Sequence, residues 1–151
     1  IVFAEPGSSH QRRLEEALLL SLLESQPSTI SPLLAQTETG ASSAILKRAV
    51  TMINDRFNDD IGLGDICAEA RATPRNLQLL FKREYGMGPI QYLHRLRLNY
   101  ARHLLLGAGR NLSIADIAEC SGHRHLGRFS AAYKQRFGEP PRETRREAPL
   151  A

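Results

Sequence analysis

The chain of 151 residues has no tryptophan, and aromatic side chains make up only 6% of it. This scarcity argues against a β-sandwich or β-barrel, because the strands of such folds are enriched in aromatic and β-branched residues. Leu, Ala and Arg are prominent instead, which is typical of helical proteins. The composition therefore predicts an all-α protein.

Cysteine and long apolar runs are scarce as well. Cys67 and Cys120 are too few for a disulfide framework, and we expect both to behave as buried apolar side chains in a reducing cytosol. Apolar runs such as Ala17–Leu20 stop far short of the roughly 20 residues that a membrane-spanning helix needs. We expect a soluble, cytoplasmic protein without a membrane partner.

Charge is distributed unevenly along the chain. Residues 1–70 hold five Lys and Arg against ten Asp and Glu, whereas residues 71–151 hold fifteen against six. A positive field concentrated on one module indicates a polyanionic partner. Charge alone leaves a second interpretation open, in which the basic residues form only a solvated face.

A loose internal repeat lies in the basic half. It pairs Asp65-Ile66-Cys67-Ala68 with Asp116-Ile117-Ala118-Glu119, 51 positions later. It also pairs Phe81-Lys82-Arg83-Glu84-Tyr85-Gly86 with Tyr133-Lys134-Gln135-Arg136-Phe137-Gly138, 52 positions later. One residue has therefore been inserted between these landmarks. Each copy predicts a short helix, a tight turn and a second helix with polar and basic residues on one side.

Capping residues place the helices of each copy. In the first copy, a helix over 63–70 and a turn over 71–73 precede a helix from Pro74 to about Tyr85, which Thr73 caps. In the second copy, Ser113 caps the first helix, and the second helix is expected over about 126–137.

A linking helix over about 89–106 is expected to join the copies. Its 18 or so residues span about 27 Å, close to the roughly 34 Å that separates successive major grooves. Two recognition helices held in this way would reach the same side of a DNA duplex.

Upstream of the repeat, a separate amphipathic helix is expected over about residues 9–24. Its broad stripe of Leu side chains predicts that it packs on a partner. Residues 27–43 are rich in Pro, Ser, Thr and Gly and are expected to form a linker with one turn of helix. The predicted fold is thus all-α, with two helix-turn-helix subdomains joined by a long linking helix over 44–146 and a tail over 147–151.

Several motifs agree in order and spacing with one known family. They are Ile66-Cys67, Phe81 to Gly86, Pro89-Ile90-Gln91-Tyr92-Leu93, Arg97-Leu98-Asn99-Tyr100-Ala101-Arg102 and, in the second copy, Leu112 to Ala118 and Tyr133 to Pro141. Residues 45–146 resemble the DNA-binding domain of the AraC/XylS family of bacterial transcription regulators. The resemblance implies sequence-specific binding of double-stranded DNA, transcription regulation, usually activation, and contact with RNA polymerase.

The segment from Leu14 to Pro27 resembles the last helix of the sensor domain in one branch of that family. The resemblance implies that residues 1–26 end a truncated sensor domain and that residues 9–24 mediate homodimerisation. A small-molecule effector would then act only through the part of the sensor domain that this chain lacks.

The resemblance also implies which side chains read bases. In the first copy they are Arg75, Gln78 and Leu79, with Asn76 beside them. Arg can bond guanine bidentately and Gln can bond adenine. Leu79 departs from the Arg that is common at its position and offers only apolar contact, for example to a thymine methyl group.

In the second copy, the matching positions at the start of the helix over 126–137 are Leu126, Gly127, Arg128, Ser130 and Ala131. Arg128 is the residue expected to read a base strongly, and His125 is expected to fill the turn or meet phosphate.

His123 replaces the Phe that the family usually carries as a core anchor. Leu126 or Leu112 is expected to supply the missing apolar contact. The second copy would then be looser, or would read DNA more through its shape and phosphates than through its bases.

Catalytic or metal-binding residues are not evident. Cys120, His123 and His125 lie in and around one turn and lack the second ligand pair of a typical zinc module, so no metal or cofactor is expected. No nucleophile–base set or paired carboxylates suggest an enzyme. Two alternatives remain open, the DNA-binding module of a methyl-accepting repair regulator with a reactive cysteine and a helical protein-interaction module.

Overall fold

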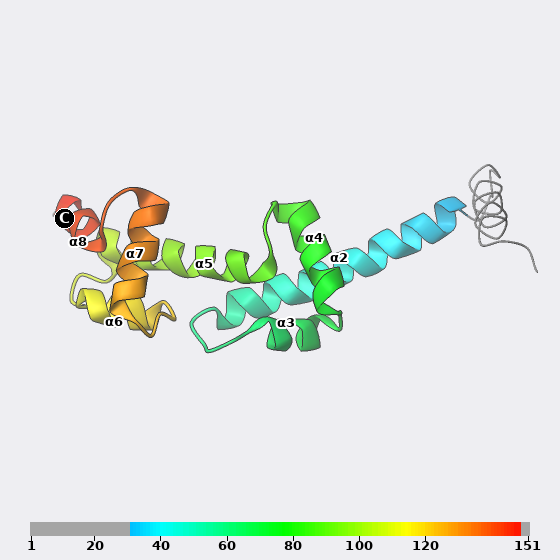
Figure 1. Ribbon diagram of the computed structural model, residues 1–151, viewed down its shortest axis with the longest axis horizontal. Coiled ribbons are helices and arrows are strands. Elements are labelled where there is room, and N and C mark those ends of the chain that lie inside the picture. The colour runs from blue at the N-terminus through cyan, green and yellow to red at the C-terminus, as the bar shows by residue number, and fades with distance from the viewer. Residues whose placement is uncertain (1–30, 149–151) are drawn as a thin grey trace, which may run out of the picture. The chain divides into compact units, whose positions relative to one another are not determined.

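A computed structural model describes residues 31–148, with side chains from residue 38 onward. All regular structure within this range is helical, which confirms the predicted class (Figure 1). The helices are α2 (Ser31–Arg56), α3 (Leu63–Ala70), α4 (Pro74–Tyr85), α5 (Pro89–His103), the π-helical turn η1 (Leu104–Ala108), α6 (Ile114–Cys120), α7 (Leu126–Phe137) and α8 (Pro141–Glu147). Within the same range, no helix has the length and apolar character to cross a membrane.

The first helix-turn-helix unit consists of α3 and α4. They pack with the C-terminal half of α2 and the first turns of α5 around one apolar core. Its buried side chains include Ala49, Ile53, Ile66, Leu77, Phe81 and Leu93. The short helices α3 and α4 are thus stabilised by tertiary packing, because isolated helices of their length are marginal in water.

The second helix-turn-helix unit consists of α6 and α7, which gather with η1 and α8 around the far end of α5 (Figure 1). Its separate core includes Leu98, Ala101, Leu105, Ile117, Phe129 and Tyr133. Because α5 contributes Leu93 to the first core and Leu98 to the second, it links the two units as the sequence predicts.

A buried hydrogen bond holds α8 on the second unit. The hydroxyl of Tyr133 donates to Thr144 Oγ1 at 3.0 Å, and Thr144 Oγ1 donates to the Glu139 carboxylate at 2.5 Å. Arg145 adds a hydrogen bond from Nη2 to the carbonyl of Leu112 at 2.7 Å. Helix α8 is therefore an integral part of this unit.

The repeated aspartates perform the same structural task in both copies. Asp65 Oδ2 accepts the backbone N–H of Gly62 at 2.8 Å, and Asp116 Oδ2 accepts that of Ser113 at 2.8 Å. Each carboxylate satisfies a backbone donor at a helix start, as in a capping box. The side-chain and backbone hydrogen bonds with Ser113 lower the pKa of Asp116.

The inserted residue of the second copy lies in its turn. Arg71 and Gly122 mark the same point of the two turns, because both have positive φ, at 55° and 80°, and stand 51 positions apart. The following N-cap residues, Thr73 and His125, stand 52 apart. Only Ala72 separates the first pair of landmarks, whereas His123 and Arg124 separate the second.

The predicted linker over 27–43 is wrong for its described part, because α2 already begins at Ser31. Pro32 stands in the first turn of α2, where its missing N–H costs nothing. A single Gly, such as Gly40, costs only about 1 kcal/mol within a helix, and extending an existing helix is easier than nucleating one. A compact unit begins at Ala41, close to the predicted position 44. The predictions for residues 1–26, including the helix over 9–24, lie outside the described residues.

The linking helix is shorter than the predicted 89–106. Regular α-helix ends at His103, and the chain continues as η1, inside which Gly107 has φ 158°. Fifteen α-helical residues span about 22 Å. The expectation that both cysteines are buried is wrong for Cys120, which is exposed at the end of α6. Cys67 is buried, and burial raises the pKa of its thiol.

Candidate nucleic-acid interface

Helix α4 begins and faces outward as expected of a recognition helix. Thr73 Oγ1 accepts the N–H of Asn76 at 3.3 Å, and Pro74 occupies the first helical position. Leu77 and Phe81 are fully buried, so the opposite side of α4 is left to solvent. The side chains exposed there, at helical spacing, are Arg75, Gln78, Leu79 and Lys82.

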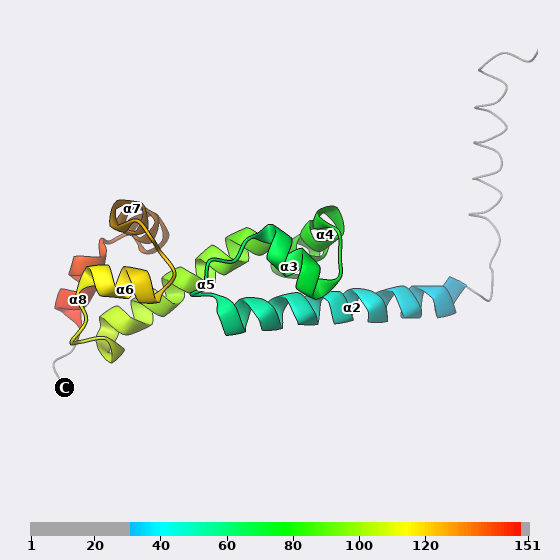
Figure 2. The ribbon, with the colours of Figure 1, turned by 90° about the horizontal axis from the view of Figure 1, so that it is seen from below.

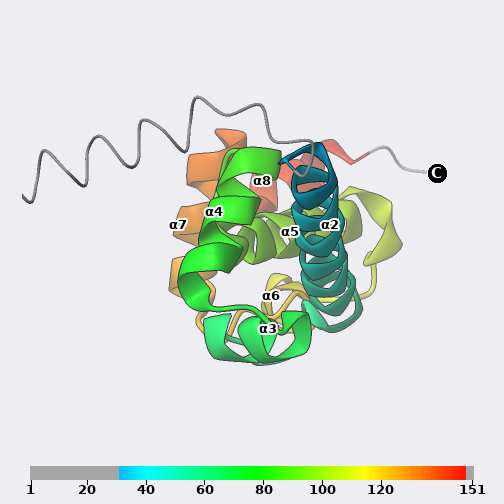
Figure 3. The same ribbon diagram turned by 90° about the vertical axis from the view of Figure 1, so that its right-hand side faces the viewer.

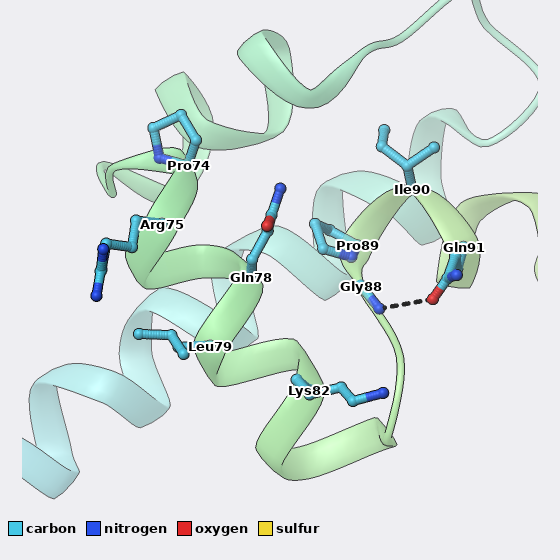
Figure 4. A pocket seen from close by; sticks show the side chains of 9 residues that line it. All are labelled: Pro74, Arg75, Gln78, Leu79, Lys82, Gly88, Pro89, Ile90 and Gln91. Carbon is cyan, nitrogen blue, oxygen red and sulfur yellow. Dashed lines mark hydrogen bonds between the residues drawn. The ribbon is translucent and has the colours of Figure 1, made fainter.

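This exposed stripe borders a groove between α4 and the first turn of α5 (Figure 4). Pro89 and Ile90 line the α5 side of the groove, and Gly88 donates its N–H to Gln91 Oε1 at 3.1 Å. Leu79 is 60% exposed, a large apolar side chain presented to solvent. The structure thus brings Arg75, Gln78 and Leu79 to one groove, whereas the exposed Asn76 does not line it.

Helix α7 borders a different groove, against α5. His125 is the N-cap of α7, makes no side-chain capping hydrogen bond and lines this groove together with Arg128 and Ala132. Across it lies His94 of α5, which the sequence analysis missed. The spacing along the sequence could have indicated its place. His94 follows Gln91 by three positions and precedes Leu98 by four, as residues on one helix face do.

The remaining residues predicted for the second copy are placed differently. Ser130 is half-buried and Ala131 is exposed, and neither lines the groove between α5 and α7. The structure therefore groups His125 with Arg128 but does not join Ser130 and Ala131 to them.

The two recognition helices share a frame but differ on their outward faces. At an offset of 52 positions, the buried Leu77 and Phe81 of α4 match the buried Phe129 and Tyr133 of α7. At the same offset, three exposed side chains of the first copy correspond to smaller ones in the second, whereas Asn76 corresponds to the larger Arg128. Gly127 corresponds to Arg75, Ser130 to Gln78, and Ala131 to Leu79.

Helices α4 and α7 lie on the same side of α5. Both stand above α5 and are seen nearly end-on in Figure 2, and the view along the long axis in Figure 3 shows them on one side. Two exposed helices presented on one side, on a basic part of the chain, form a surface suited to the successive grooves of a duplex.

Leu112, one of the two expected replacements for the missing Phe, packs on the second core, and His123 adds a core contact of its own. Its ring lies 4.9 Å from that of Phe129, centroid to centroid, while Leu126 is 46% exposed. Burial, together with the positive charges of Arg97 and His94, lowers the pKa of His123 to about 4. The imidazole is therefore neutral near pH 7 and packs much as an aromatic ring would.

Among the described side chains, no group of three or more His, Cys, Asp and Glu is arranged to hold a metal ion. Cys120, His123 and His125 thus do not form a cluster suited to metal binding.

Comparison with known proteins agrees with the two helix-turn-helix units described above. Residues 66–147, more than half of the chain, match the profile of a helix-turn-helix domain. The chain is 32% identical over 99 residues to XylDLEGF operon transcriptional activator 2 of Pseudomonas putida, covering 65% of this chain and 63% of that protein. It is 37% identical over 103 residues to the transcriptional activator NphR of a Rhodococcus species, covering 68% of this chain and 30% of that protein. The chain therefore spans less than two thirds of either relative.

Solved structures show the same arrangement of helices. A transcriptional regulator with an AraC-type DNA-binding domain from Chromobacterium violaceum has a TM-score of 0.65 and 31% identity, covering 72% of this chain and 96% of that one. The C-terminal domain of AraT, a response regulator from Geobacillus stearothermophilus, also has a TM-score of 0.65, at 30% identity, covering 71% and 88%. With its two helix-turn-helix units on a shared helix, the chain belongs to the AraC/XylS-type family of transcriptional regulators.

Proposed function

We propose that this chain is the DNA-binding part of a bacterial transcription activator that inserts α4 and α7 into successive major grooves of one duplex. The observation that carries the proposal is the presentation of both exposed helices on one side of α5 (Figure 2). A B-DNA major groove is about 12 Å wide and admits one α-helix, whose N-terminal side chains meet base edges. The excess of basic residues in 71–151 favours attraction to phosphates.

The first unit carries most of the sequence specificity in this proposal. Arg75 donates hydrogen bonds to the O6 and N7 atoms of guanine, and Gln78 forms hydrogen bonds with adenine. Leu79 contacts a thymine methyl group, which is consistent with its exposed side chain in a groove also lined by Ile90. Asn76 lies beside these residues and contacts the flanking backbone or base.

The second unit reads fewer bases. Arg128 is its strongest base contact and His125 meets phosphate, since both line the groove beside α5. Ser130 and Ala131 permit a close approach of α7 to the duplex but offer few polar contacts. A duplicated frame with unlike outward faces fits a non-palindromic site.

The activating role rests on the relatives, two of which are named as transcriptional activators. We infer contact with RNA polymerase, dimerisation through residues 9–24 and effector binding by a sensor region outside this chain. We infer that the protein acts in the cytoplasm, where bacterial DNA lies, and the family is one of regulators rather than enzymes.

Selection from a random duplex library by the full chain tests the proposal. We expect enrichment of one asymmetric site with two half-sites about one helical turn apart. Affinity for that site should fall steeply with salt, with a log–log slope of about −0.9 per phosphate contact. Equal retention of all sequences would contradict specific recognition and favour the protein-interaction alternative, and a flat salt titration would exclude a phosphate-dominated interface.

A further inference from the structure

Arg97 is a charged side chain buried where the loop after α2 meets α5 and the turn between α6 and α7. We call this meeting point of the two helix-turn-helix units the seam. Arg97 stands on α5 and is 9% exposed. Its Nε donates to the carbonyl of Phe57 at 2.6 Å, and its Nη2 donates to the carbonyl of Asp59 at 2.7 Å. The planar guanidinium fork therefore grips two backbone carbonyls of the loop that follows α2.

The position of the Phe57 carbonyl explains why a cation is stabilised there. Phe57 directly follows Arg56, the last residue of α2. The last carbonyls of a helix lack intrahelical partners, and they carry the negative end of its dipole. Replacing Arg97 by a shorter or neutral side chain would remove both hydrogen bonds and leave the ring contact of Phe57 with Tyr100, at 4.9 Å between centroids, to hold the loop on α5.

The turn of the second unit packs against this fork. Gly122 has φ 80°, and a Cβ atom added to it would lie 2.8 Å from Arg97 Nε and 3.0 Å from the carbonyl oxygen of Phe57. The backbone of the turn between α6 and α7 thus lies directly against the Arg97–Phe57 hydrogen bond. Glycine is required here by both the close approach and the left-handed conformation.

One of the two residues that lengthen the second turn also contacts the loop after α2. Arg124 pairs with Asp60 of that loop at 2.8 Å, whereas the ring of His123 packs on Phe129 within the second unit. Because the Arg124 and Asp60 side chains are 71% and 75% exposed, their pair adds little stability by itself. The buried contacts of Arg97 and Gly122 are therefore the main ones that join the second turn and α5 to the loop after α2.

The seam matters because the two apolar cores are separate. The first core meets α5 at Leu93 and the second at Leu98 and Ala101, so α5 is the element they share. Two units attached to one helix can rock about its axis unless a second connection lies off that axis. The contacts of Arg97 and Gly122 with the loop after α2 provide this second connection.

We propose that Arg97 is a positioning residue for DNA recognition, which locks the second recognition helix relative to the first and so fixes the half-site spacing that the protein accepts. The inference rests on the proposed function, since spacing has meaning only for a protein that reads two half-sites. One added base pair moves the second half-site by about 3.4 Å and turns it by roughly 35°. A rigid pair of reading helices cannot follow that change, whereas a loosened pair can.

The test compares affinities for the selected duplex and for the same duplex with one base pair inserted between its half-sites. For the natural chain we expect a penalty of at least about tenfold, comparable to a mismatched base pair. Arg97→Met should reduce the penalty to about threefold or less while keeping base preferences within each half-site, because each core is intact. Arg97→Lys, which keeps the charge without the fork, should lie between the two.

Arg95→Met is the matched control, since it removes one positive charge from the exposed side of α5. It should weaken binding to both duplexes alike and leave the spacing penalty unchanged. The same spacing penalty in folded Arg97→Met as in the natural chain would overturn the role of Arg97. Should Arg97→Met fail to fold, Arg97→Lys and Gly122→Ala carry the same comparison.

A measurement without DNA separates this inference from the proposed function. Spin labels at Arg83→Cys on α4 and Gln135→Cys on α7, both exposed positions, report the distance between the two helices in a Cys120→Ser background. We expect a narrow distance distribution that broadens on Arg97→Met and not on Arg95→Met. An unchanged distribution would overturn the inference. Failure to select any duplex would instead overturn the proposed function and leave the label distances to decide the role of Arg97.

Discussion

The imidazole of His123 packs against the ring of Phe129, with centroids 4.9 Å apart and ring planes inclined by 54°. Burial is the largest cause of the lowering of the His123 pKa to about 4, followed by the positive charges of Arg97 and His94. A half-buried neutral histidine thus takes the place of an aromatic core residue. This exchange makes the second helix-turn-helix unit sensitive to acid.

The first prediction concerns the pH dependence of stability. The unfolded chain binds a proton on His123 near pH 6.5, while the folded chain does so only near pH 4. The contribution of His123 is therefore fully present above pH 6.5 and is lost as the pH falls toward 4. Because the ring is only half-buried and solvent screens part of the effect, the loss at about pH 4.5 should be about 1–2 kcal/mol. Urea unfolding at several pH values, for the natural chain and for His123→Phe, measures this loss of stability. Between neutral pH and about pH 4.5 the natural chain should lose more stability than the variant, and the difference should equal the contribution of His123. Parallel pH profiles for the two proteins would contradict the assignment.

The second prediction concerns base reading by the first unit. Arg75→Ala should weaken binding to the selected site by about 1–3 kcal/mol and relax the preference at one base pair, because a bidentate contact to guanine is lost. Arg83→Ala removes the same charge from an exposed position later on α4 that does not line the groove. It should weaken binding less and leave base preferences unchanged. A uniform loss over all sequences on Arg75→Ala would show that Arg75 contacts phosphate only.

The third prediction concerns the docking of α8. Tyr133→Phe removes the hydroxyl that donates to Thr144, while Thr144 keeps its hydrogen bond to Glu139. The free energy of unfolding should fall by about 1 kcal/mol, the net value of a buried hydrogen bond whose partner stays satisfied. Tyr100→Phe, at an exposed position, should change it by less than about 0.5 kcal/mol. Denaturant midpoints at neutral pH give both values, and equal effects would argue against the hydrogen bond.

The fourth prediction concerns the thiols and the methyl-accepting alternative. Cys120 is exposed, whereas Cys67 is buried and burial raises the pKa of its thiol. Thiol titration of the native protein should therefore detect one accessible cysteine, with the second reacting only on unfolding. Cys120→Ser should abolish the reaction of the native protein. Rapid alkylation of Cys67 in the folded chain would instead revive the case for a reactive-cysteine protein.

Local signals in the sequence were sufficient for the helices of both units. Thr73 with Pro74 marks the start of α4, and Ser113 with Asp116 marks the start of α6, because capping depends on residues a few positions apart. The bounds of α4 were predictable for the same reason, and those of α7 from its match to α4 in the repeat. Local signals failed at α2, where Ser, Thr and Gly indicated a linker although the helix continues through them.

The sequence by itself determined the all-α class, the duplicated helix-turn-helix frame and the unlike residues on its two outward faces, since these follow from periodicity, capping and composition. Only the tertiary structure decided how the two frames are joined. The hydrogen bonds from Arg97 to the carbonyls of Phe57 and Asp59 join residues about 40 positions apart, and Gly122 of the second unit packs against them. Such contacts depend on where α2, α5 and the second turn meet in space, and no spacing within one helix specifies that.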